Sequence, residues 1–215
     1  MPVVDLFPDL PAFDVQAAAY LLPAYSQYLP QGSVCLCVVD PGVGSARAAL
    51  AVRADGRWYV GPDNGLLSLV IRRASNVTAF EITWRPQTLS ASFHGRDLFA
   101  PVCARLATGG DVPGRPVACK GLQLPDWPDD LEQVVYIDHY GNAVTGLRAG
   151  VLHLDSRIEI AGVSCDYRRT FSEAPGPDAF WYVNANGLVE IAAPASSARN
   201  LLKLAPGQPL RVINP

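Results

Sequence analysis

A chain of 215 residues, of which 49% are hydrophobic and 17% charged, has the composition of a folded globular protein with one large or two small domains. A formal net charge of −3 without any Lys/Arg block argues against a nucleic-acid partner. No apolar run reaches the roughly 18–20 residues that cross a membrane, and "MPVVDLFPDL" does not resemble a signal peptide. Five cysteines, an odd number without CxxC spacing, fit a reducing compartment, so we expect a cytoplasmic protein.

The first half of the chain alternates helix-like and strand-like segments. Residues 13–29 predict a helix with Asp14 as N-cap and a kink at Pro23, and 32–39 predict a strand buried on both faces. A hairpin is expected around Asp55-Gly56. A helix over 65–74, a strand over 77–83 and an amphipathic helix over 95–109 follow. This order predicts an α/β domain over residues 1–112, with a mostly parallel sheet and flanking helices.

The second half has a different character. Residues 113–130 are rich in Pro and Gly, which predicts a linker. Residues 131–215 consist of short alternating stretches separated by Gly, Asn, Asp and Pro, the pattern of a smaller antiparallel all-β domain.

The segment "VVDPGVGSAR" ends an apolar run on a carboxylate, Asp40. Pro41, Gly42 and Gly44 predict a tight turn, after which Arg47 is close enough to return to the Asp40 carboxylate. An arginine beside a carboxylate keeps it ionised and orients it. By spacing alone, a functional site and a turn with a salt bridge are equally good interpretations.

Further polar candidates lie in loops. His94, in "SFHGRD", precedes the helix over 95–109. No two histidines have metal-ligand spacing, so no metal is expected. "YIDHYGN" and "NANG" are ordinary turns by themselves. Cys35 and Cys37 share one face of a strand, where they are expected to act as small core hydrophobes.

Several blocks, in order along almost the whole chain, give the sequence a resemblance to a known family: "VVDPGVGSAR", "VGPDNGLLS", "FHGRDLFAP", "IDHYGN" and "NGLVEIA". They resemble the S-adenosylmethionine (SAM) hydrolases, or SAM hydroxide adenosyltransferases, relatives of fluorinases and chlorinases. The resemblance implies that water attacks ribose C5′ of SAM, giving adenosine and methionine without a metal or organic cofactor. It also implies a homotrimer in which the substrate lies between the N-terminal domain of one subunit and the C-terminal domain of the next.

The resemblance assigns roles to particular residues. The set that handles the water falls on Asp40, Arg47 and His94, and either Asp40 or His94 is the base. Asp138 matches the acid that holds the methionine ammonium, and Asn142 the residue that reads the adenine edge. Tyr140 and Phe13 match aromatic residues lining the substrate. The turn of Asn184, Ala185 and Asn186 matches the segment that receives the methionine carboxylate, where the family often has a serine in place of Ala185.

Two departures from the family pattern bear on function. Halogenating relatives carry an insertion that "AVRADGRWYVGPDNG" lacks, and a serine where this chain has Gly95, so hydrolysis is preferred over halogenation. The family also opens with a strand, a "TDFG"-like turn that binds ribose, and a helix. This chain begins at the expected second strand, "PVVDLF", so roughly thirty residues are expected to be absent through a late start assignment, truncation or loss. A catalytically impaired SAM- or adenosine-binding protein is therefore the alternative to an active hydrolase.

Overall fold

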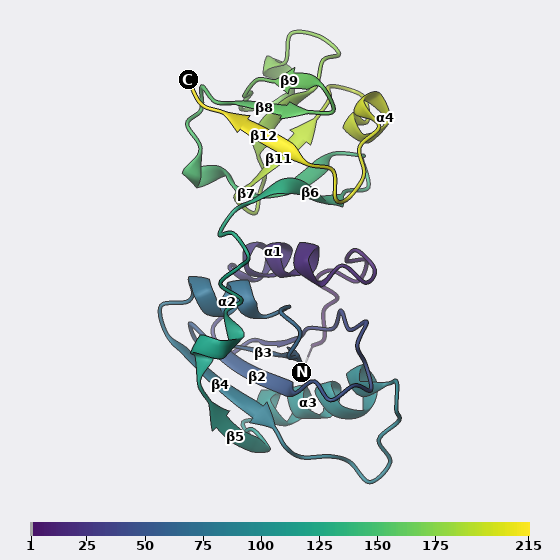
Figure 1. Cartoon of the computed structure of the whole chain (residues 1–215), viewed down its shortest axis with the longest axis vertical. Coiled ribbons are helices and arrows are strands. Elements are labelled where there is room, and N and C mark those ends of the chain that lie inside the picture. The colour runs from purple at the N-terminus through teal and green to yellow at the C-terminus, as the bar shows by residue number, and fades with distance from the viewer. Residues whose placement is uncertain (1) are drawn as a thin grey trace. The chain divides into compact units, whose positions relative to one another are not determined.

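The computed structural model describes residues 2–215, which divide into two compact units, one up to Trp127 and the other from Pro128 to Pro215 (Figure 1). The division falls near the end of the predicted linker. However, most of segment 113–130 belongs to the first unit, because it contains strand β5 (Gly114–Val117) and a 3-10 turn, Cys119–Leu122. A strand with Pro116 is tolerated here because β5 is an edge strand.

The first unit is an α/β layer structure. Its sheet has the order β1-β3-β2-β4-β5. The remaining strands are β1 (Val34–Leu36), β2 (Ala49–Ala54), β3 (Arg57–Pro62) and β4 (Val77–Ile82). The helices are α1 (Val15–Ser26), α2 (Ser68–Arg73) and α3 (Ala100–Ala107), the last preceded by a π-helical turn, Gly95–Phe99.

Two hydrophobic clusters cover the two faces of this sheet. Leu50 and Val52 of β2 pack with α1 and α2, whereas Ala49 and Ala51 pack with the π-helical turn and α3 (Figure 1). This alternation along one strand follows from the period of two in a β-strand. The predicted α/β class with flanking helices is confirmed.

The direction of the strands differs from the prediction. Only the β1–β3 pair is parallel, while the β2–β3, β2–β4 and β4–β5 pairs are antiparallel, so the sheet is mixed rather than mostly parallel. The hairpin at Asp55-Gly56 is present as predicted, with both residues at positive φ. Because of this hairpin, β2 lies between β3 and β4 as an antiparallel strand, so the sheet is not a series of parallel strands joined by crossovers.

The strand predicted within 32–39 is shorter and more exposed than expected. β1 is an edge strand, and Leu36 and Val38 are exposed, while Cys37 is buried and Cys35 packs against the same core. Burial on both faces was therefore wrong, and the shared inward face of the two cysteines was right. The segment "PVVDLF" forms no strand. Alternating apolar residues do not make a strand without a pairing partner, and Phe7 instead stacks on Tyr25 of α1.

The second unit is built from antiparallel strands around one core. One sheet has the order β10-β11-β7-β6 and the other β12-β8-β9. Their strands are β6 (Leu131–Ile137), β7 (Ala143–Arg148), β8 (Arg157–Ile160), β9 (Val163–Cys165), β10 (Phe180–Val183), β11 (Leu188–Ala192) and β12 (Leu210–Ile213). Short helical turns cover Ala149–Val151, Phe171–Glu173 and α4 (Ala198–Leu202). Trp181 is fully buried in this core and donates from its indole N–H to the Ser156 carbonyl at 2.9 Å.

Candidate functional site

The backbone between the end of β1 and Asp40 is held in place by hydrogen bonds to neighbouring groups. Beyond β1, the Cys37 N–H donates to the Val60 carbonyl at 2.8 Å. The Asn64 side-chain amide then donates to the Val39 carbonyl at 2.8 Å, directly before Asp40. Asn64 is itself oriented because its Oδ1 accepts the Leu66 N–H. Asn64, in the turn directly after β3, thus fixes the position from which the Asp40 side chain projects.

Asp40 and Arg47 form a two-point ion pair across the glycine turn. Arg47 Nε donates to Asp40 Oδ1 at 2.7 Å, and Nη2 donates to Oδ2. The two side chains are only 5% and 9% exposed. A fork of parallel charge-assisted hydrogen bonds fixes distance and orientation together. The predicted return of Arg47 to Asp40 is present in the structure.

Gly44 allows this turn to pack closely. Its φ of +83° lies in the left-handed region, and a Cβ there would come within 2.7 Å of the Ala91 carbonyl oxygen. Both the backbone conformation and the lack of space require glycine. The close contact joins the 40–47 turn to the loop that carries His94.

His94 and Phe99 complete the surroundings of the Arg47 guanidinium. Arg47 Nη2 lies 3.4 Å from Nδ1 of His94, and the guanidinium carbon lies 5.4 Å from the centroid of the Phe99 ring. His94 is the N-cap of the π-helical turn, a type of irregularity often found at functional sites. Because Arg47 can only donate, Nδ1 must accept, which leaves the proton of a neutral His94 on Nε2. Asp40, Arg47 and His94 therefore form one cluster.

Asp63 is a neighbouring carboxyl group that the sequence interpretation did not single out. The Asp63 N–H and Arg47 Nη1 both donate to the Ala48 carbonyl, at 3.0 and 3.2 Å. Burial raises the pKa of Asp63, while the Arg47 charge opposes that rise. In the sequence, the motif "GPDNG" was the only indication of Asp63 and Asn64, and the interpretation of that motif assigned no role to either residue.

In the second unit, Asp138 and Asn142 close the β6–β7 turn. Asp138 Oδ1 accepts the Asn142 backbone N–H at 2.8 Å, and Oδ2 accepts the Asn142 side-chain amide at 3.0 Å. Tyr140, at the tip of this turn, is 77% exposed. In this structure Asp138 therefore holds both the backbone and the side chain of Asn142 in place.

The second polar turn of this unit joins β10 to β11. Asn184 Oδ1 accepts the backbone N–H groups of Asn186 and Leu188, at 2.9 and 3.0 Å, while Ala185 is exposed. Asn184 Nδ2 donates to the carboxylate of buried Glu190 at 2.9 Å. Sequence reasoning missed Glu190, although a glutamate within the apolar strand "LVEIA" was the available signal.

Phe13 is 81% exposed and has a φ of +65°, an unusual backbone conformation for a bulky residue. The following residue, Asp14, is the predicted N-cap of α1 and accepts the Ala17 N–H at 2.8 Å. The ring is therefore held outward at the start of α1, where it is accessible to a ligand.

The cysteines are not arranged for chemistry. All five are free, and burial raises the pKa of the Cys35 thiol to about 11 and that of Cys103 to about 12. Such thiols are poorly ionised and unreactive at neutral pH. Within residues 2–215, no group of three His, Cys, Asp or Glu side chains is arranged to hold a metal ion. Over the same residues, none of the helices combines the length and apolar character needed to cross a membrane.

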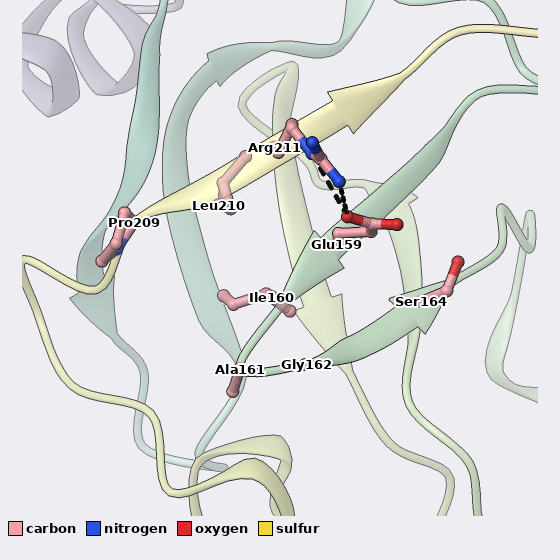
Figure 2. Close-up of a pocket in the computed structure, with 8 residues that line it drawn as sticks. All are labelled: Glu159, Ile160, Ala161, Gly162, Ser164, Pro209, Leu210 and Arg211. Atoms are coloured by element: carbon pink, nitrogen blue, oxygen red, sulfur yellow. Dashed lines mark hydrogen bonds and ion pairs between the residues drawn. The ribbon is translucent and has the colours of Figure 1, made fainter.

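A pocket of about 440 Å³ lies in the second unit, beside the β8–β9 hairpin and β12 (Figure 2). Arg211 and Glu159, directly opposite each other on paired strands, form an exposed ion pair at its wall. None of the predicted site residues lines it. We therefore do not assign the reaction to this pocket.

Sequence comparisons identify both units. Residues 1–114 match the SAM hydroxide adenosyltransferase N-terminal domain, and residues 132–211 match the corresponding C-terminal domain. A protein named (R)-S-adenosyl-L-methionine hydrolase from Thermus thermophilus is 41% identical, covering 98% of this chain and 88% of the relative. One of the same name from Salinispora arenicola is 37% identical, covering 98% and 85%. A fluorinase from Actinopolyspora mzabensis is 26% identical, covering 98% and 86%.

Solved structures share the fold. A crystal structure of a conserved hypothetical protein from Thermus thermophilus superposes with a TM-score of 0.76 at 39% identity, covering 98% of this chain and 87% of that one. An uncharacterized conserved protein from Thermotoga maritima gives a TM-score of 0.87 at 24% identity, covering 99% and 89%. The second likeness concerns the fold alone.

Proposed function

Because the chain belongs to the SAM hydroxide adenosyltransferase family, we propose that it hydrolyses SAM to adenosine and L-methionine. The observation that carries this proposal is the cluster of Asp40, Arg47 and His94, which the fold assembles from two separate loops. The names of the hydrolase relatives from Thermus thermophilus and Salinispora arenicola specify the (R) form of SAM, so that epimer is the proposed substrate.

The proposed reaction is a displacement at ribose C5′. A water oxygen forms a bond to C5′ while the C5′–S bond breaks, and the sulfur keeps the electron pair and leaves as the neutral thioether of methionine. No acid is needed for this leaving group. The difficulty lies in orienting a weak nucleophile and removing its proton.

The geometry favours Asp40 over His94 as the proton acceptor. Arg47 donates toward His94 Nδ1, which leaves His94 Nε2 as an N–H donor able to orient the water oxygen. The Asp40 carboxylate accepts both Arg47 hydrogen bonds and still has lone pairs for a water proton. Arg47 orients both groups.

Substrate contacts are proposed for the remaining residues. Phe13 and Tyr140 supply exposed aromatic faces, and Asn142 faces the adenine edge. Asp138 would attract the methionine ammonium, and the turn of Asn184, Ala185 and Asn186 would receive the carboxylate through backbone N–H groups. In this proposal SAM is the substrate, and the reaction uses no cofactor.

We further propose that the protein acts as a homotrimer in the cytoplasm, with active sites at the subunit interfaces. Exposed Leu36 and Val38 at the edge of the first sheet supply apolar surface for association. Five free cysteines fit a reducing compartment. Light scattering tests the trimer, which would have three times the chain mass of 23.0 kDa; a monomer at working concentration would contradict it.

Chromatography tests the reaction. The protein is incubated with (R)-SAM and, separately, with the (S) epimer, and adenosine and methionine are followed with Asp40→Ala as control. The proposal is supported if wild type releases adenosine and methionine in equal amounts and Asp40→Ala releases neither. Binding of adenosine without turnover would identify a binding protein instead. Formation of a 5′-halogenated nucleoside in chloride or fluoride would identify a halogenase, which the two-residue link of the β2–β3 hairpin disfavours.

A further inference from the structure

The backbone ladder between β1 and β3 loses a donor before it reaches Asp40. The two strands are paired in parallel, and just beyond β1 the Cys37 N–H donates to the Val60 carbonyl at 2.8 Å. Continuing the register of this pair makes Pro62 the next donor, to the Cys37 carbonyl, but proline has no N–H. The chains nevertheless lie close together, because a Cβ at Gly61 would come within 2.3 Å of the Cys37 carbonyl oxygen. A different donor is therefore needed to hold the chain between this point and Asp40.

The side chain of Asn64 is that donor. In the same register, the backbone N–H of residue 64 would pair with the Val39 carbonyl, and here Asn64 Nδ2 donates to that carbonyl at 2.8 Å. The amide is itself held, since its Oδ1 accepts the N–H of Leu66 at 3.2 Å and Leu66 is buried. A side-chain amide thus extends the ladder to the residue directly before Asp40.

The turn after β3 also holds the far end of the loop that joins Asp40 to Arg47. The Asp63 N–H donates to the Ala48 carbonyl at 3.0 Å, and Arg47 Nη1 donates to the same oxygen at 3.2 Å. Two adjacent residues therefore hold the main chain just before Asp40 and just after Arg47. The contact from Asp63 is made by the backbone, whereas the contact from Asn64 is made by a side chain, so a substitution removes the second contact alone.

We propose that Asn64 is a positioning residue that sets where the Asp40 carboxylate meets the attacking water. The inference rests on the proposed function, in which Asp40 accepts a proton from that water. Asn64 acts through the Val39 carbonyl and not on the water or on SAM. Loss of its N–H donor should therefore slow the chemical step, because the reacting carboxylate is displaced while the contacts proposed for the substrate at Asp138 and Asn142 are kept.

Asn64→Asp removes the donor with almost no change in shape. The introduced carboxylate still accepts the Leu66 N–H, but it places an oxygen against the Val39 carbonyl. With (R)-SAM at pH 8, kcat should fall at least about tenfold and KM should change less than about threefold. Asn64→Ser is the uncharged companion variant: its hydroxyl accepts from Leu66 but is too short to reach Val39, so its kcat should fall as well. It decides the question if Asn64→Asp does not fold.

The pH dependence of Asn64→Asp separates positioning from general damage. Burial and the facing carbonyl oxygen favour protonation of the introduced carboxyl group, which then donates an O–H to the Val39 carbonyl. The kcat of this variant relative to wild type should therefore rise at least about threefold from pH 8 to pH 5. The same ratio for Asn64→Ser should stay constant. The titratable groups around the turn are common to all three proteins: Asp40, Arg47, Asp63 and His94.

Asn76→Asp is the matched control for the added charge. Asn76 is exposed at the opposite end of β3, beside the β2–β3 hairpin, where its N–H donates to Asp55 Oδ1 at 2.8 Å. Its kcat should equal that of wild type at both pH values.

Exchange of the Arg47 Nε proton with water, followed by NMR, reports on the cluster without SAM. This proton is hydrogen-bonded to Asp40 Oδ1, with 2.7 Å between the heavy atoms, so it exchanges slowly only while the pair is in place. Asn64→Asp should speed this exchange at least about tenfold at pH 8. If wild type hydrolyses no SAM, the proposed function fails, and the exchange rate still decides whether Asn64 positions Asp40.

Two kinds of result overturn the inference. One is an Asn64→Asp variant whose Arg47 Nε exchange is unchanged or whose kcat stays within about threefold of wild type. The other is a loss of kcat that is equally large at pH 5 and pH 8, which would show that Asn64 is merely structural.

Discussion

Replacing Arg47 by lysine tests whether the guanidinium fork, rather than its charge, organises the proposed catalytic cluster. Arg47 donates twice to Asp40, once to the Ala48 carbonyl, and contacts His94 Nδ1. A lysine ammonium is a compact charge on a flexible chain and does not reproduce this planar set of donors. Asp40 would keep a cationic neighbour but lose its fixed orientation.

The expected effect falls on the chemical step. Misplacement of a reacting group by about 1 Å costs on the order of 100-fold, or about 2.7 kcal/mol in the activation free energy. We therefore expect Arg47→Lys to lower kcat with SAM about 100-fold and to change KM by less than about threefold. Single-turnover chromatography of adenosine measures the chemical step directly.

Arg53→Lys is the matched control for this substitution. Arg53 is exposed on β2 and lies over the Trp58 ring at 5.8 Å, without a contact to the cluster. Its kcat should equal that of wild type. If Arg47→Lys retains kcat within about threefold of wild type, the guanidinium fork does not organise catalysis and the reasoning is refuted.

Three further predictions follow from single contacts. Gly44→Ala should lower activity at least about tenfold because its Cβ would meet the Ala91 carbonyl, whereas Gly32→Ala, with a similar φ and open space, should affect only stability; equal activity losses would contradict this. Because folding raises the pKa of Glu190, the contribution of this residue to stability falls as the pH rises above the ordinary pKa of a glutamate. The melting temperature of wild type relative to Glu190→Gln should therefore decrease from pH 4 to 8; a constant difference across this range would contradict the raised pKa. Cys103, whose pKa is about 12, should react with a thiol reagent at pH 8 only upon unfolding, and fast labelling of a Cys103-only variant would show that it is accessible.

Local backbone chemistry accounts for the features that the sequence predicted well. Asp55-Gly56 adopts positive φ at both positions, which few residue pairs other than Asx-Gly do easily, so the hairpin was readable. Asp14 accepts a backbone N–H at the start of α1, as an N-cap residue should. The Asp40–Arg47 pair was readable because a glycine turn brings back a residue seven positions later. Each of these features depends on residues close together in the chain.

Features that depend on residues far apart in the chain could not be predicted from the sequence in the same way. The sheet was expected to be mostly parallel because helices alternate with strands, but the pairing of β2 with both β3 and β4 makes it mixed. The exposure of Leu36 follows from the edge position of β1. The apolar pattern of "SVCLCVV" does not indicate whether the strand has a neighbour on one side or on both. Strand order is a property of the whole sheet, so a local apolar run does not specify it.

The residues missed at the candidate site share one physical property, because each acts on another polar group rather than on a ligand. Asn64 holds the carbonyl before Asp40, and Glu190 holds Asn184. A side chain that orients a neighbour has no spacing rule of its own, since its partner sits on a different strand. Such residues become visible only when burial and hydrogen bonding are known. For the same reason, the effect of mutating such a residue depends on the group that it orients, so the loss of Asn64 should alter the chemical step through Asp40.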